Sequence, residues 1–201
     1  MLGSGSSVFT DHIAYQASLR DLMDLDVTPE GEFRVRLTRA QLPHVHVLHA
    51  REARPRSGEI VLPSKRSFLM FSTRRNSSPI CDGVPLHLGE MVYYSGGERL
   101  RHETTVACCW GCISLPTERI LTDGRTFLGQ SFVPPTSGQV LCPPMPERTR
   151  LLRQFAQVGS VAEKTPDSIA HPEVARALEQ ELISTLVACL ETDGRSPTGL
   201  V

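Results

Sequence analysis

Residues 33–38 have the sequence Phe-Arg-Val-Arg-Leu-Thr, in which an apolar side chain alternates with a polar one. Successive side chains of a β-strand point to opposite faces, so this alternation is typical of a strand with one face on a core and the other in water. The arginines of the stretch then form a solvated face. The same period of two continues over residues 31–115 and predicts a β-rich region there.

Further short strands are expected in this region, separated by Pro, Gly and Asn residues that favour turns. The clearest turn is Gly96-Gly97, because paired glycines accept the positive φ that a tight hairpin demands. Several short strands with turns between them favour a sandwich or a barrel. The further strands are expected at residues 45–50, 59–62, 67–72, 91–94, 99–106 and 107–115.

The period of the pattern changes after Pro116. Residues from Thr117 predict a short helix, and residues 146–158 carry apolar side chains at helical spacing. A last helix is predicted to begin at Pro172 and to end at Gly194, because Pro suits the first turn of a helix and Gly its end. The apolar stripe of this helix either packs on its own domain or forms the seam of an antiparallel dimer. The stripe consists of Val174, Leu178, Leu182 and Leu186.

The chain has 201 residues and a mass of 22.2 kDa, which suits one main core. The fold class is therefore predicted to be α+β, mainly a β-barrel followed by a C-terminal helical hairpin. Residues 1–30 are expected to form an N-terminal extension that packs on the barrel, and residues 31–116 the barrel itself. Residues 117–191 would form a helical connector and dimerisation-type helices, and residues 192–201 a disordered tail.

The chain carries 21 Lys and Arg against 22 Asp and Glu, so its formal net charge is −1. A protein that holds nucleic-acid phosphates by itself usually has a basic excess, so we expect no direct DNA binding by this chain. The N-terminus has neither the basic nor the apolar region of a signal peptide, and no run of about 18 apolar residues could span a membrane. We therefore expect the chain in the cytoplasm, with its six cysteines reduced.

His44 and His46 are two residues apart, and on a strand their rings would project from the same face. Two imidazoles placed in this way can share one metal ion. Cupin barrels use such a His-x-His pair with a nearby Glu and a third His, for which Glu52 or Glu90 and His102 are the candidates. A metal-dependent cupin enzyme, such as a dioxygenase or an isomerase, is therefore one hypothesis. In the other interpretation the histidines line a strand face or a pocket wall, and no cofactor is expected.

Residues 109–112 (Cys-Trp-Gly-Cys) have the spacing of a redox motif. In such a motif a helix N-terminus lowers the pKa of the first thiol, but here residues 113–116 are expected to end a strand. We therefore interpret the cysteines as small apolar strand residues. The single tryptophan, Trp110, then either fills the core or forms an aromatic pocket wall. The chain has no Walker-type glycine loop and no Gly-x-Ser-x-Gly motif, which argues against nucleotide enzymes and hydrolases.

Several segments taken together are similar to a known family. They are Phe9, Tyr15-Gln16-Ala17, Gly31-Glu32-Phe33-Arg34, Leu42-Pro43, Gly89-Glu90-Met91-Val92, Gly97-Glu98-Arg99, Trp110-Gly111-Cys112-Ile113-Ser114-Leu115-Pro116 and His171-Pro172-Glu173-Val174-Ala175. With these segments the chain resembles the N-terminal regulatory part of AraC-type transcription regulators, in the branch with an AraC-binding-like cupin domain. The resemblance runs from about Phe9 to Leu190 and implies a cupin-like barrel, or jelly roll.

The resemblance implies that the barrel senses a small effector, that the following helices dimerise, and that a C-terminal domain of two helix-turn-helix units reads DNA. The chain ends at Val201, where that domain would begin, and is expected to lack it. The expected function is an effector-sensing and dimerisation module that forms a homodimer through its C-terminal helix and is not an enzyme. The predicted wall of the effector pocket consists of His44, His46, Phe68, Tyr94, His102 and Trp110.

Overall fold

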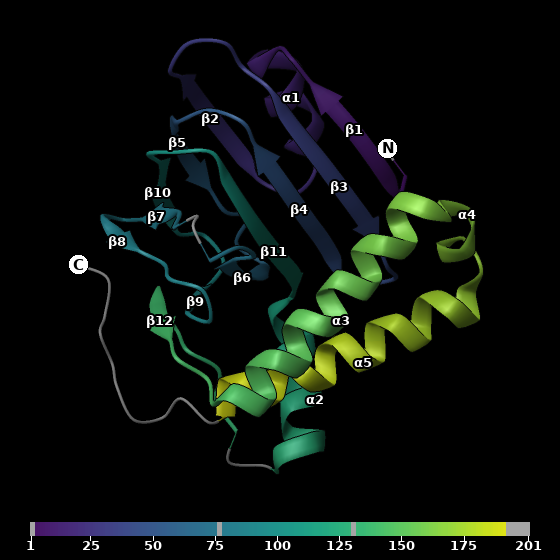
Figure 1. The fold of residues 1–201 in the computed structure, drawn as a ribbon. Helices are drawn as coiled ribbons and strands as arrows, with labels where there is room; N and C mark the ends of the chain where they lie inside the picture. Colours follow the sequence, from purple (N-terminus) through teal and green to yellow (C-terminus); the bar gives the residue numbers. More distant parts are fainter. Residues whose placement is uncertain (1–2, 76–77, 130–131, 192–201) are drawn as a thin grey trace.

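Two antiparallel β-sheets and a layer of helices make up the fold (Figure 1). The structure is a computed structural model, and it describes residues 3–75, 78–129 and 132–191. The fold class is α+β, as predicted, with a β-sandwich of two antiparallel sheets followed by helices. None of the described helices combines the length and the apolar character that crossing a bilayer requires.

One sheet has seven strands and the other has five. The seven-stranded sheet has the order β1 (Gly5–Phe9), β3 (Val35–Gln41), β4 (His46–Glu52), β11 (Cys108–Pro116), β6 (Arg66–Ser72), β9 (Met91–Tyr94) and β12 (Gln139–Leu141). The five-stranded sheet has the order β2 (Asp24–Pro29), β5 (Arg56–Val61), β10 (Arg99–Thr104), β7 (Ile80–Cys81) and β8 (Val84–Pro85). The helices are α1 (His12–Leu19), α2 (Thr117–Leu128), α3 (Met145–Lys164), α4 (Pro166–Ile169) and α5 (Pro172–Glu191).

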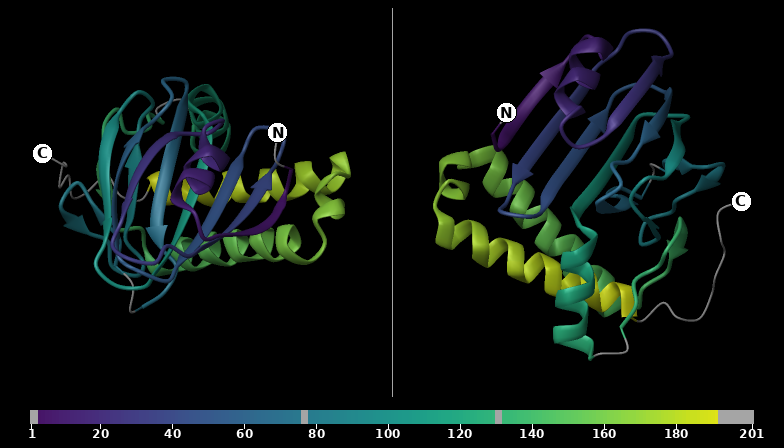
Figure 2. Two further views of the ribbon diagram at one scale, coloured as in Figure 1. Left: turned by 90° about the horizontal axis from the view of Figure 1, so that it is seen from above. Right: turned by 180° about the vertical axis from the view of Figure 1, so that it is seen from behind.

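The middle of the seven-stranded sheet is buried on both faces, because it lies between the five-stranded sheet and the helices (Figure 2). On β4, Val47 packs into the core on the helix side, whereas Leu48 packs into the core inside the sandwich. On β11, Ile113 faces the helices and Trp110 faces the inside. A strand buried on both faces has no polar side to alternate with, which explains the nearly continuous apolar run of residues 108–115.

The predicted strands are present as β3, β4, β5, β6, β9, β10 and β11, and β9 has the predicted ends. The turn at Gly96-Gly97 is also present, with Gly97 at a φ of +87°. It is not a hairpin turn, however, because β9 belongs to the seven-stranded sheet and β10 to the five-stranded one. The turn therefore carries the chain from one layer of the sandwich to the other.

Residues 5–29, within the expected N-terminal extension, supply edge strands to both sheets. β1 pairs with β3, and β2 pairs with β5. Between them, α1 begins after Asp11, whose carboxylate accepts hydrogen bonds from the backbone nitrogens of Ile13 and Ala14 at 3.1 Å. At the other end of the chain, the predicted tail at residues 192–201 and the predicted helix end at Gly194 lie outside the described residues.

α3 and α5 run antiparallel and are joined by α4, so the predicted helical hairpin is present (Figure 1). The apolar side chains predicted for the first of these helices are buried at helical spacing, as Leu151, Phe155 and Val158 show. The helix continues beyond the predicted residue 158 to Lys164. α3 contacts β3 and β4 directly, so its sheet-side face forms one wall of any space between the two layers.

Candidate functional site

A buried ion pair joins Glu52, at the end of β4, to Arg56, at the start of β5. The Glu52 and Arg56 side chains are 1% and 2% exposed, and Arg56 Nη2 and Nε lie 2.8 and 2.9 Å from Glu52 Oε1. Trp110 Nε1 of β11 donates to the same carboxylate oxygen at 2.7 Å. Because β5 belongs to the smaller sheet, the pair ties the two sheets together inside the sandwich.

His102 of β10 completes this cluster. Arg56 Nη2 lies 3.0 Å from His102 Nδ1, and Arg56 Nη1 donates to the His102 carbonyl at 3.2 Å. A guanidinium nitrogen can only donate, so Nδ1 accepts and the ring is neutral. Burial, and then the positive charge of Arg56, hold the pKa of His102 well below its usual value. Among the described residues, Glu52 Oε2, His102 Nε2 and Tyr15 Oη have no hydrogen-bond partner.

Four of the six side chains predicted to line an effector pocket lie inside the sandwich. Phe68, Tyr94 and Trp110 belong to the inner core and are each 1% exposed. The His102 and Trp110 rings lie 5.4 Å apart. The structure therefore brings these four residues into one packed interior, and none of them lines the groove described below.

His44 lies outside the strand on which it was predicted. The chain turns between β3 and β4, where Leu42 N donates to Val45 O at 2.9 Å, and β4 begins only at His46. His44 Nδ1 lies 2.9 Å from Glu179 Oε1 of α5, and the backbone nitrogen of His44 donates to Glu179 Oε2 at 2.6 Å. The residue therefore fastens the β3–β4 turn to the helical layer instead of facing a pocket with His46.

The structure does not bring the three proposed metal ligands, His44, His46 and His102, together. His46 and Glu52 are at opposite ends of β4, about 20 Å apart at a rise of about 3.3 Å per residue. His102 lies at the Glu52 end, where Arg56 contacts both. Over residues 3–75, 78–129 and 132–191, no three His, Cys, Asp or Glu side chains are grouped to hold a metal ion. The three histidines therefore do not form the shared metal site that the enzyme hypothesis requires.

The apolar stripe of α5 packs largely on its own domain. Leu178, Leu182 and Leu186 are 9%, 0% and 1% exposed and belong to the core on the helix side of the sheet. Val174, in the first turn of the helix, is 39% exposed. Of the two alternatives that the periodicity allowed, intramolecular packing thus applies to three of the four residues.

Cys109 and Cys112 point to opposite faces of β11, because they are three residues apart on a strand. Cys112 lies in the inner core, where burial raises the pKa of its thiol to about 12. Cys109 faces the helical layer and lines the groove described next. Two thiols on opposite faces of one strand cannot form a disulfide without distorting the strand, so the Cys-x-x-Cys spacing carries no redox pair.

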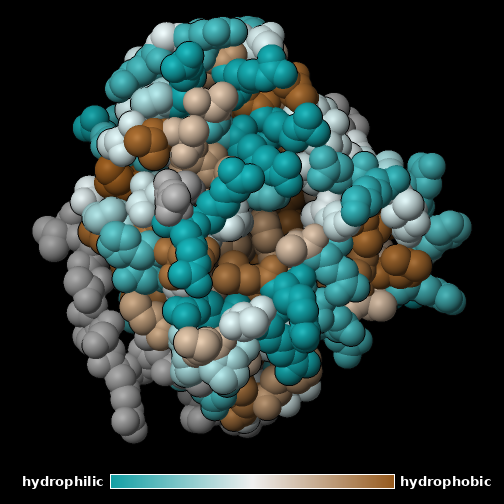
Figure 3. All heavy atoms as spheres, viewed as in Figure 1, coloured by the Kyte–Doolittle hydropathy of each residue, from teal (hydrophilic) through white to brown (hydrophobic). Residues whose placement is uncertain are grey.

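A groove with a volume of about 520 Å³ lies between α3 and the outer face of the seven-stranded sheet. A hollow with hydrophobic atoms at its bottom and hydrophilic atoms around it is visible on this face of the molecule (Figure 3). The sheet side of the groove consists of His49, Arg51, Thr73, Arg74 and Cys109. The helix side consists of Leu152, Phe155, Ala156, Gly159, Ser160, Glu163 and Lys164.

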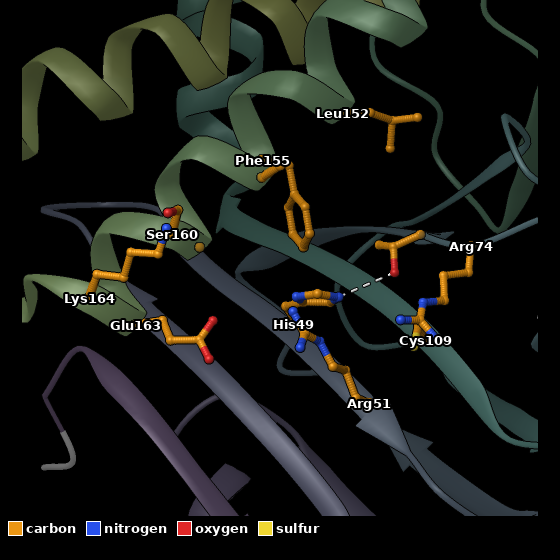
Figure 4. A pocket seen from close by; sticks show the side chains of 12 residues that line it. His49, Arg51, Arg74, Cys109, Leu152, Phe155, Ser160, Glu163 and Lys164 are labelled. Atoms are coloured by element: carbon orange, nitrogen blue, oxygen red, sulfur yellow. Dashed lines mark hydrogen bonds between the residues drawn. The ribbon is translucent and has the colours of Figure 1, made fainter.

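Phe155 lines the groove and packs directly on the sheet. Its ring lies 4.9 Å from that of Phe71 and 5.7 Å from that of His49, edge to face in both cases. Figure 4 shows the Phe155 ring pointing toward His49. This close approach depends on Gly111 of β11, since a Cβ there would lie 2.6 Å from Phe155 Cζ and 2.7 Å from Phe71 Cε2. The absence of a side chain at Gly111 therefore permits α3 to pack at this short distance from the sheet.

The variant Gly111→Ala is expected to lower the free energy of unfolding by about 1–3 kcal/mol, because two packed aromatic rings must move to admit the new methyl group. Urea unfolding of the two proteins measures this difference. The matched control is Gly159→Ala on α3, where a Cβ meets no atom within 4 Å, so this variant should gain about 0.5–1 kcal/mol of helix propensity. Equal stability of Gly111→Ala and the parent chain would contradict the tight seat of Phe155.

A second hollow of about 470 Å³ adjoins the groove and shares Arg51, Arg74 and Cys109 with it. Arg75 lines this second hollow, and Lys164 lines the groove. The two spaces thus bring four basic side chains to one region of a chain whose net charge is −1. The sequence alone could not reveal this region, because its basic residues come from three separate segments.

The histidine in the groove is uncharged at neutral pH. Burial is the largest cause that lowers the pKa of His49, to about 4, and the positive charge of Arg51 is the next. His49 Nε2 lies 3.2 Å from Thr73 Oγ1, as the dashed line in Figure 4 shows. The positive charge of the groove therefore comes from its arginines and its lysine. The arrangement is suited to holding an anionic group next to an aromatic side chain.

No protein-family model matches the chain, and no curated protein matches it. Among solved structures, the AraC-like transcriptional activator CuxR matches with a TM-score of 0.63 at 15% identity, over 98% of this chain and 73% of that chain. ToxT from Vibrio cholerae matches over 87% and 61% of the two chains, with a TM-score of 0.33 at 5% identity. A mutant of Bacillus subtilis oxalate decarboxylase OxdC matches over 85% and 40%, with a TM-score of 0.32 at 9% identity. The match to CuxR establishes a shared fold.

Proposed function

We propose that this chain is the effector-sensing and dimerisation module of an AraC-like transcription regulator. The observation that carries the proposal is the fold shared with the activator CuxR, which extends over 98% of this chain and so includes the helical layer as well as the sheets. The net charge of −1 agrees with a module that leaves the binding of DNA phosphates to another domain.

An effector in the groove would act on the helices directly. α3 forms one wall of the groove and packs against α5, while Glu179 of α5 holds the β3–β4 turn through His44. A ligand that contacts both the sheet and α3 binds one placement of the helices more tightly than another, and so shifts the population toward that placement. In the regulator, this shift would change how the helical layer presents the attached DNA-binding domains.

We place the homodimer contact on the exposed surface of the helical layer, including the first turn of α5. Leu178, Leu182 and Leu186 are buried within one chain, so their side chains cannot also contact a second copy. Val174 is 39% exposed in that first turn and is therefore available to a second copy. A large apolar side chain on the surface of a monomer becomes favourable when a partner covers it.

The dimerisation part of the proposal predicts that the chain will bring together two copies of a DNA-binding domain that represses a reporter gene only as a dimer. Fused to such a domain, the parent chain should restore repression, and Val174→Glu should weaken dimerisation by about tenfold or more because a carboxylate would be desolvated at the contact. Reporter expression in cells, with the fusion protein quantified by immunoblot, gives the measurement. Val8→Glu, at a valine that is 46% exposed on β1, is the matched control and should repress like the parent.

The outcome against the proposal is a parent fusion that represses no better than the DNA-binding domain alone at equal abundance. Equal repression by the Val174→Glu and Val8→Glu fusions would contradict the placement of the contact on α5.

A further inference from the structure

The groove beside α3 has basic side chains on its sheet side and apolar side chains on its helix side, and none of the side chains predicted from the sequence to form a pocket lines it. We propose that it binds a small organic anion, whose phosphate or carboxylate is held by Arg51 and Arg74 and whose apolar or aromatic part packs against Phe155. Binding itself does not depend on the function proposed above, whereas control of the dimer by this ligand does.

The first argument is the placement of Arg51 on the sheet. Arg51 of β4 lies opposite Arg36 of β3 in the antiparallel register. Like charges in directly opposite positions destabilise a sheet. The carboxylate of Glu163 on α3 compensates the positive charge of Arg36, since Glu163 Oε1 lies 3.3 Å from Arg36 Nη1. No described residue does the same for Arg51, which forms no ion pair within that part of the chain, so an anion bound beside it would remove an unfavourable interaction.

The second argument is that the backbone next to Arg74 is fixed. Thr73 N donates to Cys109 O at 3.0 Å, and the Thr73 hydroxyl lies 3.2 Å from His49 Nε2. Ser72 Oγ donates to the carbonyl of Arg74 at 2.9 Å. These contacts tie the end of β6 to the neighbouring strands at the point where Arg74 leaves the sheet. A cation on a fixed backbone loses less conformational freedom when it binds an anion.

The third argument is the shape of the helix wall. Leu152, Ala156, Gly159 and Ser160 recur at helical spacing along the side of α3 that faces the groove, and three of these four side chains are small. Gly159 lies in the interior of the helix, where glycine costs about 0.5–1 kcal/mol relative to alanine, and a Cβ there would meet nothing within 4 Å. The volume of about 520 Å³ lies within the range of small-molecule sites.

The chemistry of the site selects the ligand class. Arginine presents planar sets of N–H donors that match the oxygens of a carboxylate or a phosphate, and a charged acceptor makes these hydrogen bonds stronger. Phe155 and Leu152 offer apolar contact on the opposite wall. A neutral aromatic compound would form no charge-assisted hydrogen bonds with the arginines, and a bare inorganic anion would leave the apolar wall in contact with water.

Calorimetric titration of the whole chain with four probes tests the proposal. Phenyl phosphate or benzoate should bind at least about tenfold more tightly than both phenol and inorganic phosphate, because each of the latter retains only half of the interaction. Comparing phenyl phosphate with benzoate distinguishes a phosphate ligand from a carboxylate ligand. The double variant Arg51→Gln/Arg74→Gln should lose the preference for the anionic probe. Arg99→Gln, at an exposed arginine of β10 outside the groove, should keep it.

A second pair of variants separates loss of binding from loss of folding. Gly159→Leu should fill the groove and abolish phenyl phosphate and benzoate binding while the melting temperature stays at or above that of the parent chain. Gly159→Ala should raise the melting temperature and weaken binding less. Phenol binding as tightly as both anionic probes, or unchanged binding in Arg51→Gln/Arg74→Gln or in Gly159→Leu, would overturn the proposal. Repression by the dimer reporter fusion is a separate readout, so the two proposals can fail independently.

Discussion

The variant Glu52→Leu is expected to lose about 3–5 kcal/mol of its free energy of unfolding, because it leaves the Arg56 guanidinium buried without its counter-ion. Arg56 is 2% exposed, and both Nε and Nη2 of its guanidinium lie within 2.9 Å of the same carboxylate oxygen. Trp110 Nε1 would lose its acceptor as well. Urea unfolding followed by tryptophan fluorescence measures the change, since Trp110 lies beside the substituted residue.

The double variant Glu52→Leu/Arg56→Leu is the informative control. With both charges removed, folding no longer has to transfer two ions out of water. Replacing a buried ion pair by apolar residues therefore often leaves the free energy of unfolding unchanged. The double variant should therefore be more stable than Glu52→Leu alone. Glu59→Gln, which removes an exposed partner of Arg99, should stay within about 0.5 kcal/mol of the parent chain. A Glu52→Leu protein as stable as the parent would show that the buried pair contributes nothing.

Acidification from pH 7 toward pH 4 is expected to destabilise the chain strongly. Burial lowers the pKa of His46 and of His49 to about 4 in the folded state, and it also holds the pKa of His102 well below its usual value. The unfolded chain, with histidine pKa values near 6.5, therefore binds more protons below that pH than the folded chain does. The contribution of these neutral histidines to the free energy of unfolding is fully present above pH 6.5. It is lost as the pH falls from the histidine pKa values of the unfolded chain toward those of the folded chain.

The measurement is the urea midpoint as a function of pH. A fully buried histidine such as His102 contributes a slope of up to about 1.4 kcal/mol per pH unit, and the partly exposed His46 and His49 contribute less because solvent screens them. The variant His49→Gln keeps a polar group near Thr73 but does not titrate, so its slope should be shallower. A urea midpoint that does not change between pH 7 and pH 5 would contradict the neutral, buried state of these rings.

Periodicity located the strands well, because alternation is decided by which face of a strand meets the core. It also located Cys108–Pro116, where turn residues mark the ends of an apolar run. It failed at His44, since the start of β4 is set by the turn that Leu42 and Val45 close and not by the side-chain pattern. The His-x-His spacing therefore predicts that both rings share one strand face, whereas His44 belongs to a turn.

The groove could not be predicted from any local pattern. Arg51 and Phe155 are more than a hundred residues apart in the sequence, and their meeting depends on the way α3 crosses the sheet. The four interior residues Phe68, Tyr94, His102 and Trp110 were accessible to prediction because each lies on a strand. Whether such residues enclose a cavity or a filled core depends on the volumes of all their neighbours, which the pattern does not contain.

The order of strands in the larger sheet has a consequence for synthesis of the protein. β4 has β3 on one side and β11 on the other, so one of its edges stays unpaired until residue 116 has left the ribosome. During that interval the nascent chain presents the open hydrogen-bonding edge of a strand that carries Val47 and Leu48. Such an edge can pair with another chain, so the growing polypeptide is exposed to aggregation through this edge until β11 emerges.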